Sequence, residues 1–545
     1  MGKDRDQGKR RRRRKKKSAI PIILIILLAT LGCIGYVAAY FFLPNFEIVK
    51  FHEYFEINPD EVTVVIRDKR MSLEDKPILQ NGELYFPIQF VKEYIDPYIF
   101  WDSVTQKITI TTEDKVTRLM PGENTYYENG EPVSLDVPPY FIDSRAYLPI
   151  NFLTQIYHIT ISFNDEENIA TMDYLDEPRE RGIINSEKAR LRYKPDKRAI
   201  SGLGFIPGEE LSIYEVEGEY TRVRTDIGLL GYVYTEYIDI AKPIESVPKP
   251  NPKVYSKTPI NGKINMVWDQ VIAIEDNAED WRRHTHDGLD VLSPTWFSFD
   301  ASLDGSIVNI ADIDYINWAH EQGYQIWPLL SDFSPNSESI LNMDVSNTVL
   351  KDTDIREHVI KQLIGYVSLY RLDGINIDFE YIQPDNAENY LQFFRELSPY
   401  MNEAGAYLSV DVYNPVLPDY WSRYYNRSEL GKVVDYVCVM SYDEHIDSKT
   451  GAGAVASLPF VRDGMLQTLD EIPKEKIIMG LPFYTRVWKE SGGELTAQAH
   501  GMQTAYDMFN GRDAIVSWDE VLGVYYGEYV EDDATYKVWL EELES

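Results

Sequence analysis

The sequence predicts a multidomain protein with an N-terminal transmembrane helix and a C-terminal β/α barrel. Three observations support this fold class: a charge-free stretch of 25 residues near the N-terminus, an internal repeat with an offset of 62 residues, and seven strand-like segments that alternate with helix-like ones from about Val254. A chain of 545 residues is also too long for one domain, since domains typically hold about 100 to 200 residues.

A basic tail precedes the charge-free stretch. Residues 1–18 carry about +9 and the whole chain −34, which leaves about −43 for the remainder. An acidic body of this size repels phosphate backbones and argues against nucleic-acid binding. Residues 19–43 (Ala19 to Leu43) can cross a bilayer, for which about 20 residues suffice. The basic flank places the N-terminus in the cytoplasm and the long remainder of the chain outside. We therefore expect a single-pass membrane anchor rather than a cleaved signal peptide, whose apolar region usually has about 7 to 15 residues.

The Cys and His residues indicate neither a disulfide nor a metal site. Cys33 lies in the predicted membrane span and Cys438 in an apolar run, so the two cannot plausibly pair. The eight His are scattered, and His284 and His286 fit a polar loop better than a metal site. We expect no metal and no organic cofactor.

An internal repeat follows the membrane segment. YFPIQF at Tyr85–Phe90 recurs as YLPINF at Tyr147–Phe152, and each copy precedes an aromatic residue and a short β-like run. This predicts a duplicated α+β unit over residues 61–175. The unit resembles the copper-amine-oxidase N-terminal-like stalk of bacterial surface proteins. Because it contains no metal-ligand cluster, we interpret it as a spacer or a wall-binding module.

Short alternating strands separated by Pro and Gly turns occupy residues 182–240, which is typical of a small β-barrel. GLLGYVYTEYI resembles the closing strand of a bacterial SH3-like domain, a module that often holds cell-wall peptides. A purely structural spacer is an equal alternative. Residues 241–253 are rich in Pro and charge and predict a semi-rigid linker.

Strands and longer helical segments alternate over residues 254–545, which predicts parallel β/α units. The seven strand-like segments are INMVW, VLSPTWF, YQIWPLL, GINIDFE, YLSVDVY, YVCVMSY and KIIMGLP. The closed form of such a chain is the eight-stranded β/α (TIM) barrel. No eighth strand is recognisable, because AIVSW and VYYGEYV indicate a small antiparallel insertion. Either the barrel closes irregularly or the chain is an incomplete fragment, and we favour a fragment.

Polar residues alternate with apolar ones along the fourth strand. In GINIDFE, three apolar residues alternate with Asn376, Asp378 and Glu380, and side chains two residues apart share a face of a strand. In a barrel the polar row faces the axis, and Glu380 lies at the C-terminal mouth, where active sites occur. Close carboxylates cannot both ionise cheaply, so one keeps a proton near neutral pH and can act as a general acid. We expect Glu380 to be that acid and Asp378 its charged partner, with a structural acid network as the alternative.

DGINIDFE resembles the DxxDxDxE signature of glycoside hydrolase family 18, the chitinase-like family, with Asn376 in place of the second Asp. Three further stretches agree in order and spacing: the strand end that contains Trp296, VMSYDEH at Val439–His445, and GLPFYTRVW at Gly480–Trp488. The combination with a stalk repeat and an SH3-like domain resembles the spore-cortex and cell-envelope branch of the family.

The resemblance implies substrate-assisted retention, in which the substrate replaces the second carboxylate as the nucleophile. Glu380 protonates the glycosidic oxygen, and the 2-acetamido oxygen of the substrate attacks the anomeric carbon. Asp378 and Tyr442 orient the acetamide and stabilise its developing charge. Asp373, Asn376 and Asp443 are supporting residues, and Asn376 can hydrogen-bond Asp378.

Aromatic residues near the strand ends are candidates for sugar binding, since sugars lie flat on aromatic rings. The candidates for substrate binding, including one arginine that can bind a substrate hydroxyl or hold Asp443, are Trp268, Trp296, Trp327, Tyr413, Tyr484, Arg486 and Trp488.

These observations lead to two hypotheses. The first is a membrane-anchored glycosidase on a bacterial cell surface that hydrolyses β-1,4 glycans containing N-acetylglucosamine, with peptidoglycan preferred over chitin as the substrate. Cleavage within chains and cleavage from their ends both fit this description. The second is a catalytically silent surface protein that binds carbohydrate or cell wall with the same barrel.

Overall fold

The structure is a computed structural model, and it describes residues 20–45, 47–50, 54, 58, 60–278, 284–300, 302–332, 342–380, 382–418 and 424–541. The chain forms two compact units, the first from residues 1–86 and 150–249 and the second from residues 87–149 and 250–545. The boundary between them falls inside the predicted stalk region, residues 61–175. The predicted basic tail, residues 1–18, lies outside the described residues.

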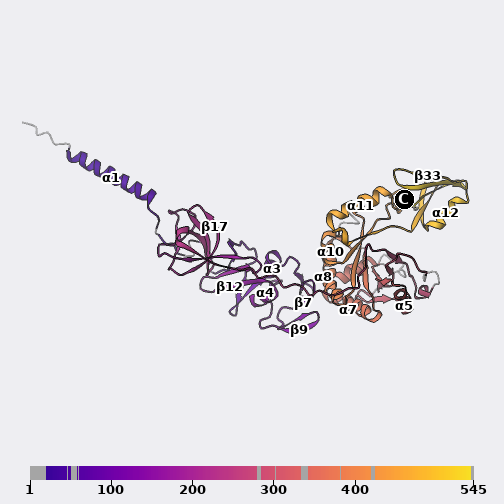
Figure 1. Ribbon diagram of the computed structural model, residues 1–545, viewed down its shortest axis with the longest axis horizontal. Helices are drawn as coiled ribbons and strands as arrows, with labels where there is room; N and C mark the ends of the chain where they lie inside the picture. The colour runs from indigo at the N-terminus through magenta and orange to yellow at the C-terminus, as the bar shows by residue number, and fades with distance from the viewer. Residues whose placement is uncertain are drawn as a thin grey trace, which may run out of the picture. The chain divides into compact units, whose positions relative to one another are not determined.

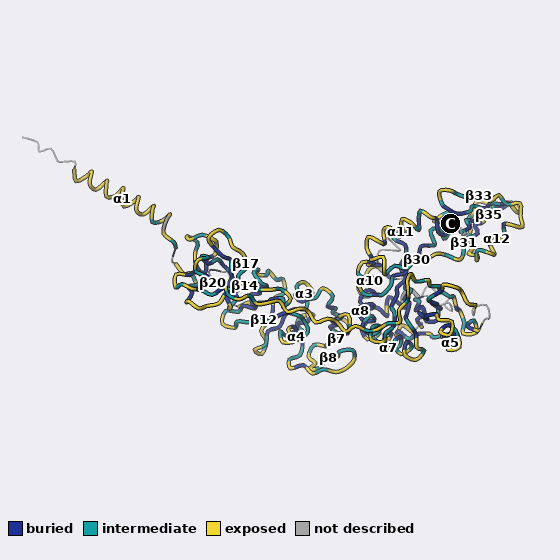
Figure 2. Tube along the Cα trace, viewed as in Figure 1, coloured by how far each residue is buried: buried dark blue, intermediate teal, exposed yellow. Residues whose placement is uncertain are grey.

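The N-terminal apolar segment forms the helix α1 (Ile20–Phe42). Figure 2 shows that α1 is exposed along its length. Residues 20–41 have a mean hydropathy of 2.6 and are long enough to cross a membrane. The helix nearly coincides with the predicted span, and its length and composition fit both a membrane anchor and a signal sequence.

The first unit contains a four-stranded sheet and a seven-stranded sheet that share one hydrophobic core. The four-stranded sheet has the order β12-β13-β1-β2, with β1 parallel to β13. Side chains from both sheets, among them Val65, Ile169 and Val223, fill the core. The strands of the four-stranded sheet are β1 (Thr63–Ile66), β2 (Lys69–Arg70), β12 (Ile159–Asn164) and β13 (Ile169–Tyr174).

All four strands that the sequence indicates between residues 182 and 240 are present in the seven-stranded sheet, whose order is β16-β15-β19-β18-β17-β14-β20. The resemblance to an SH3-like domain stays a prediction. The strands are β14 (Arg179–Ile184), β15 (Arg190–Arg192), β16 (Ser201–Gly204), β17 (Glu210–Glu217), β18 (Tyr220–Thr225), β19 (Leu230–Tyr234) and β20 (Ile238–Ile244).

The two repeat motifs fold alike, each as a hairpin followed by a short helix. The first copy consists of β3 (Ile78–Gln80), β4 (Glu83–Pro87) and α3 (Ile88–Tyr94), and the second of β10 (Tyr140–Ile142), β11 (Arg145–Pro149) and α4 (Ile150–Ile156). Between the copies, five strands form an antiparallel sheet in the second unit: β5 (Phe100–Asp102), β6 (Lys107–Thr111), β7 (Val116–Leu119), β8 (Thr125–Glu128) and β9 (Glu131–Ser134).

All seven predicted barrel strands are present, and neighbouring strands pair in parallel in chain order. The second and third are each interrupted into two segments. Within the described residues, no eighth parallel strand pairs with the seventh. The strands are β21 (Met266–Asp269), β22 (Val291–Pro294) with β23 (Phe297–Phe299), β25 (Gln325–Ile326) with β26 (Leu329–Ser331), β27 (Gly374–Asp378), β28 (Tyr407–Tyr413), β29 (Tyr436–Met440) and β30 (Ile477–Gly480); β24 (Ile307–Asn309) pairs antiparallel with β23.

Helices lie around these strands (Figure 1), and all but the last of them bury an apolar face in the core that the strands share. They are α5 (Ile313–Gln322), α6 (Asn342–Lys351), α7 (Thr353–Tyr370), α8 (Ala387–Glu403), α10 (Arg427–Val433) and α11 (Leu458–Glu471). The last helix, α11, leaves Leu458, Leu466 and Leu469 about half exposed. The capping residues explain the limits of α5: the Asp312 side chain accepts a hydrogen bond from the Tyr315 amide, and Gly323 ends the helix with a φ of 89°.

The predicted antiparallel insertion follows β30 as a separate five-stranded sheet with the order β32-β31-β35-β34-β33. It has its own small core around Val487, Phe509 and Val538, covered by α12 (Met502–Asn510). Its strands are β31 (Tyr484–Ser491), β32 (Glu494–Gly501), β33 (Ile515–Asp519), β34 (Val524–Glu531) and β35 (Ala534–Leu540).

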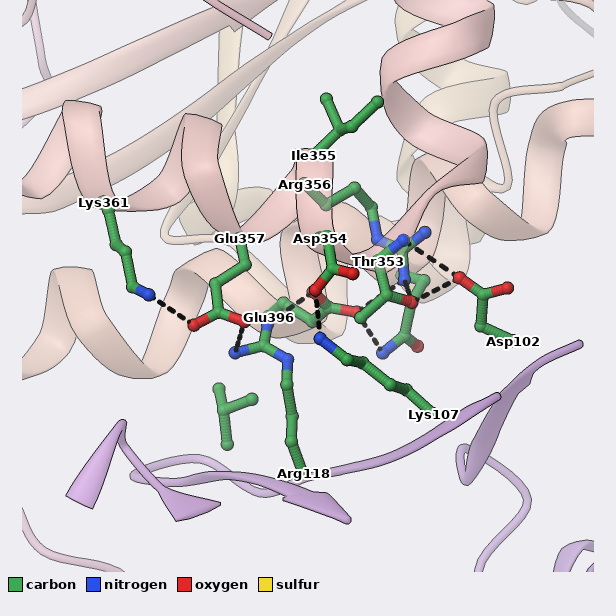
Figure 3. A network of polar contacts seen from close by, with 12 residues as sticks. Asp102, Lys107, Arg118, Thr353, Asp354, Ile355, Arg356, Glu357, Lys361 and Glu396 are labelled. Atoms are coloured by element: carbon green, nitrogen blue, oxygen red, sulfur yellow. Dashed lines mark hydrogen bonds and ion pairs between the residues drawn. The ribbon is translucent and has the colours of Figure 1, made fainter. Parts of the chain in front are cut away.

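A buried polar network joins the β5–β9 sheet to the barrel helices α7 and α8 (Figure 3). Arg118 of β7 binds Glu396 of α8 at 2.8 Å, and Arg356 of α7 binds the other oxygen of the same carboxylate at 3.0 Å. At the start of α7, the Asp102 carboxylate accepts hydrogen bonds from the Thr353 amide and hydroxyl at 2.9 and 2.7 Å. This sheet is therefore bonded to the barrel by interactions between residues roughly 250 or more positions apart in the sequence.

Candidate active site

The fourth barrel strand, β27, has the predicted two-faced character. Ile375, Ile377 and Phe379 are fully buried in the core under the helices. Asn376 and Asp378 point the other way, and Glu380 follows two residues after the end of β27. The row of polar groups therefore ends at the carboxyl edge of the parallel strands, where β/α proteins place their sites.

A cavity of about 320 Å³ lies at this edge. Asp378 and Glu380 contribute to its wall, so both acids reach the space that a ligand would occupy. The other lining residues come from the ends of the first three strands and from β24: Gln270, Val271, Ile272, Thr295, Trp296, Phe297, Ser298, Val308, Ile310, Leu329 and Ser331.

Asp378 lies in a strongly negative environment. Burial raises the pKa of its carboxyl well above the ordinary value, and the carboxyl groups of Glu380, Asp411 and Asp332 raise it further. Its Oδ1 atom is buried and has no hydrogen-bond partner among the described residues. A buried oxygen without a partner is costly for a protein, and here it can accept a hydrogen bond from a ligand.

Glu380 is held from several directions. Its Oε2 atom accepts a short hydrogen bond from the Tyr413 hydroxyl. Its backbone amide donates to Asp332 Oδ1 at 3.1 Å, and its carbonyl accepts from the Tyr424 hydroxyl at 2.6 Å. Burial raises the pKa of Glu380, the Tyr413 hydrogen bond opposes this rise, and the charge of Asp443 adds to it. The net upward shift favours a protonated Glu380, the form that a general acid requires.

Asn376 donates its hydrogen bonds to other residues than the expected Asp378. Its hydrogen bonds go to Asp411 Oδ1 at 2.8 Å and to Ser409 Oγ at 3.0 Å, and its own Oδ1 accepts from Trp268 Nε1 at 3.0 Å. The expected bond to Asp378 is therefore replaced by bonds to the neighbouring strand. The reason is the register of β27 and β28, which sets Asn376 directly opposite Ser409.

Two site residues, Asp332 and Asp411, were missed by the sequence reasoning. Asp411 lies in YLSVDVY, where it alternates with apolar residues and shares a face with Ser409 and Tyr413, so the parity argument used for β27 also applied to β28. Asp332 follows directly after β26. An acid directly after a strand was the sequence feature that could have identified it.

Tyr442 and Asp443 follow the sixth strand at the same edge. Burial, and then the charges of Asp411, Asp378 and Glu380, raise the pKa of the Tyr442 phenol, so it stays protonated and can donate a hydrogen bond. Asp443 accepts hydrogen bonds from the Tyr484 hydroxyl at 2.7 Å and from Arg486 Nη2 at 3.0 Å. Of the two roles considered for Arg486, the structure shows the one in which it holds Asp443.

The predicted aromatic residues separate into two groups. Trp268 and Tyr413 lie in the site through their bonds to Asn376 and Glu380. Trp327 is fully buried at the strand starts, with its ring 5.0 Å from that of Tyr407. Because it is fully buried, it offers no face to a sugar.

Trp296 and Trp488 are also buried. The Trp296 indole donates to Asn277 Oδ1 at 2.8 Å, and the ring is 1% exposed beside the cavity. The Trp488 indole donates to the Gly453 carbonyl at 3.0 Å, and the ring is fully buried. A stacked sugar needs an accessible ring face, which the fully buried Trp488 does not offer. Trp296 lines the cavity, and its part in substrate binding stays a prediction.

Asp373 lies at the opposite end of β27 from Glu380. Its Oδ2 atom accepts from the Ile326 amide at 2.9 Å and lies 2.8 Å from His320 Nε2 of α5. The residue thus ties a helix and a strand at the amino-terminal edge of the sheet. Its supporting role is a structural one, because the length of β27 separates it from the cavity.

Comparison with known families agrees with this geometry. Residues 346–540 match the sequence model described as "Glycosyl hydrolases family 18". The chain contains a glycosyl hydrolase family 18 domain. Residues 52–172 match the model described as "Copper amine oxidase N-terminal domain". Among the described residues, no group of three or more His, Cys, Asp or Glu side chains is arranged to hold a metal, so we derive no copper chemistry from this match.

The relatives of the family 18 domain include two proteins of Bacillus subtilis. The "Uncharacterized glycosylase YvbX" is 26% identical over 38% of this chain and 60% of its own length. The "Cortical fragment-lytic enzyme" is 24% identical over 46% of this chain and 58% of its own length. The chain thus spans less than two thirds of either relative. Among solved structures, the Bacillus cereus spore cortex-lytic enzyme SleL aligns at 17% identity with a TM-score of 0.45, over 63% of this chain and 82% of its own.

Proposed function

We propose that this protein hydrolyses β-1,4 glycans that contain N-acetylglucosamine, with peptidoglycan as the preferred substrate over chitin. The observation that carries the proposal is the pair Asp378 and Glu380 at the cavity. The pKa of Glu380 is raised and its carboxyl group is held by the Tyr413 hydroxyl. Asp378 Oδ1 is buried and has no hydrogen-bond partner in the part of the chain that the structure describes. The cortical fragment-lytic relative supports peptidoglycan by its name.

In the proposed reaction, Glu380 protonates the glycosidic oxygen, and the acetamide oxygen of the substrate forms a bond to the anomeric carbon as the glycosidic bond breaks. Asp378 Oδ1 accepts the hydrogen bond of the acetamide N–H. The positive charge that develops on the acetamide then lies next to Asp378, and the ionised form of this carboxyl group stabilises it. Tyr442 donates a hydrogen bond to the same group from the sixth strand.

We further propose that α1 anchors the protein in the membrane of a bacterial cell, with the catalytic unit outside. The eleven basic residues before α1 support this orientation. The seven-stranded sheet of the first unit and the repeat would hold or approach the cell wall. Measuring the retention of the detergent-solubilised full chain on purified wall sacculi, with excess N-acetylglucosamine oligomers present to occupy the cavity, tests this part, and absence of retention above a serum albumin control contradicts it.

Hydrolysis is tested with the detergent-solubilised full chain on peptidoglycan and on chitin oligomers, by release of reducing ends. We expect release by the wild type and a loss of about 100-fold or more in Glu380→Gln, since general acid catalysis contributes about 10²–10⁴ in rate. Glu321→Gln on α5 is the matched control and retains full activity. If wild type and Glu380→Gln are equally inactive while glycans still bind, the silent surface protein is the correct alternative.

A further inference from the structure

Four carboxyl groups meet at the site, and the proposed mechanism uses only two of them. Asp332 accepts hydrogen bonds from the Glu380 amide at 3.1 Å and the Ser346 hydroxyl at 3.2 Å. Among the described residues, the charges that act on Asp378 all come from carboxyl groups. Asp411 is the remaining group, and it is 2% exposed. Burying a carboxyl group among other carboxyl groups costs free energy of folding. This cost indicates that Asp411 has a function in the site.

The contacts of Asn376 determine which way its amide points. Trp268 Nε1 can only donate, so the Asn376 atom that it meets at 3.0 Å is the acceptor Oδ1. The amide nitrogen is therefore left to donate to Asp411 at 2.8 Å and to Ser409 at 3.0 Å. Asn376 thus holds a fixed donor against Asp411, and such a donor favours the charged carboxylate.

Opposing influences act on Asp411. Burial raises the pKa of Asp411, the hydrogen bonds from Asn376, Cys438 and Trp268 lower it, and the charge of Glu380 raises it, with a result of about 7. Asp411 in turn raises the pKa of Asp378, which neighbours it on β27. Asp411 therefore changes its charge near neutral pH.

We propose that Asp411 is a positioning residue whose charge sets the ionisation of Asp378 and Glu380, and that Asn376 is the rigid link that keeps this carboxylate in place. The inference rests on the proposed function. Asp411 does not touch the ligand space, since it is absent from the cavity lining. The titratable groups that interact with its charge include Asp378, Glu380, Cys438, Tyr442 and, from α8, Tyr390.

The test is the pH dependence of kcat/KM in Asp411→Asn, measured with the full chain in detergent on a chromogenic N-acetylglucosamine oligomer. The charge of Asp411 raises the pKa of Asp378, and the charge of Glu380 raises that of Asp411. Because the interaction of two charges is mutual, removing the Asp411 charge is expected to lower the pKa of both Asp378 and Glu380. We therefore expect the acidic and the alkaline limb to move to lower pH, by about one pH unit. On the alkaline limb, a shift of one pH unit leaves about a tenth of the wild-type kcat/KM at the same pH. Limbs that do not move overturn the proposal.

A double variant separates charge from packing. In Asn376→Asp/Asp411→Asn the carboxylate and the amide exchange places, and the number of charges and the hydrogen bond between them are kept. We expect both limbs to return at least halfway to their wild-type positions. A double variant that resembles Asp411→Asn shows that the residue only packs. If Asp411→Asn does not fold, Asn376→Asp alone tests the proposal. The carboxylate that it adds must move both limbs of the pH profile to higher pH. Limbs that do not move refute the proposal.

Failure of the proposed function is distinguishable from failure of this inference. A wild type without activity on either glycan refutes the function. The inference is then tested by the pH dependence of thermal unfolding: a buried acid with a raised pKa destabilises the fold as pH rises from about 4 to 7. The wild type must lose more stability over this range than Asp411→Asn, and equal losses refute a charged Asp411 in the fold.

Discussion

Replacing Arg118 by Met is expected to destabilise the second unit strongly. Arg118 is 8% exposed and Glu396 is fully buried, so the substitution leaves a buried carboxylate with one arginine instead of two. Removing one partner of a buried ion pair costs about 3–5 kcal/mol. Arg356 and Gln392 still bond the other oxygen, Oε1, each at 3.0 Å. We therefore expect the lower end of this range, about 3 kcal/mol.

The assay is urea unfolding of the solubilised full chain, followed by tryptophan fluorescence. All ten tryptophans fall in the residue ranges of the second unit, so the signal reports that unit alone. The matched control is Lys361→Ala, which removes an exposed partner of Glu357 and costs about 1 kcal/mol or less. A loss for Arg118→Met no larger than that of the control would falsify the view that this network holds the sheet to the barrel.

The pH dependence of the free energy of unfolding lost in Arg118→Met gives a second test. Burial raises the pKa of Glu396, but Arg356 and Arg118 more than offset this, and the pKa lies below its ordinary value. A carboxyl group with a lowered pKa stabilises the fold above its unfolded pKa, and this contribution is lost as pH falls through the folded pKa. The cost of Arg118→Met must therefore be smaller near pH 3 than at pH 7.

Two further substitutions test the packing and the acid. Gly374→Ala places a methyl group 2.7 Å from Trp327 Cδ1 and 2.9 Å from the Tyr407 carbonyl, so we expect a loss of about 1–3 kcal/mol by the same fluorescence assay. Gly365→Ala on α7, where nothing lies within 4 Å, should instead stabilise slightly. Tyr413→Phe removes the hydrogen bond that lowers the pKa of Glu380, so the alkaline limb of kcat/KM should move to higher pH. A limb that stays or moves to lower pH shows that Glu380 is not the titrating acid.

The sequence pattern predicted the strands and their faces because side chains alternate between the two faces of a strand, whatever the strand packs against. The alternation in GINIDFE places Ile375 and Ile377 in the core and Asn376 and Asp378 toward the axis, and the structure agrees. The same reasoning did not predict how deep each aromatic side chain lies. Trp327 and Trp488 follow strand patterns like that of Trp268, yet both are fully buried, because depth depends on neighbours from other strands.

Contacts between strands and between distant segments were not predictable from one strand at a time. The bond between Asn376 and Asp411 depends on the register of β27 and β28, which neither sequence pattern contains. The row on β27 consists of Asn376 and the two acids Asp378 and Glu380. The acceptor for the Asn376 amide nitrogen is Asp411, which lies on the neighbouring strand β28. The role of Asn376 could therefore be inferred only once the structure showed Asp411 beside it.

The bond between Arg118 and Glu396 has a consequence for where the catalytic unit begins. A boundary at Val254, the one that the sequence pattern indicates, removes Arg118 and Asp102 together. Glu396 then keeps one arginine, and the Thr353 amide at the start of α7 loses its acceptor. Since α7 leads directly into β27, which carries the acids, the β5–β9 sheet stabilises the element that delivers Asp378 and Glu380. The stalk-like segment is in this sense part of the catalytic unit rather than only a spacer.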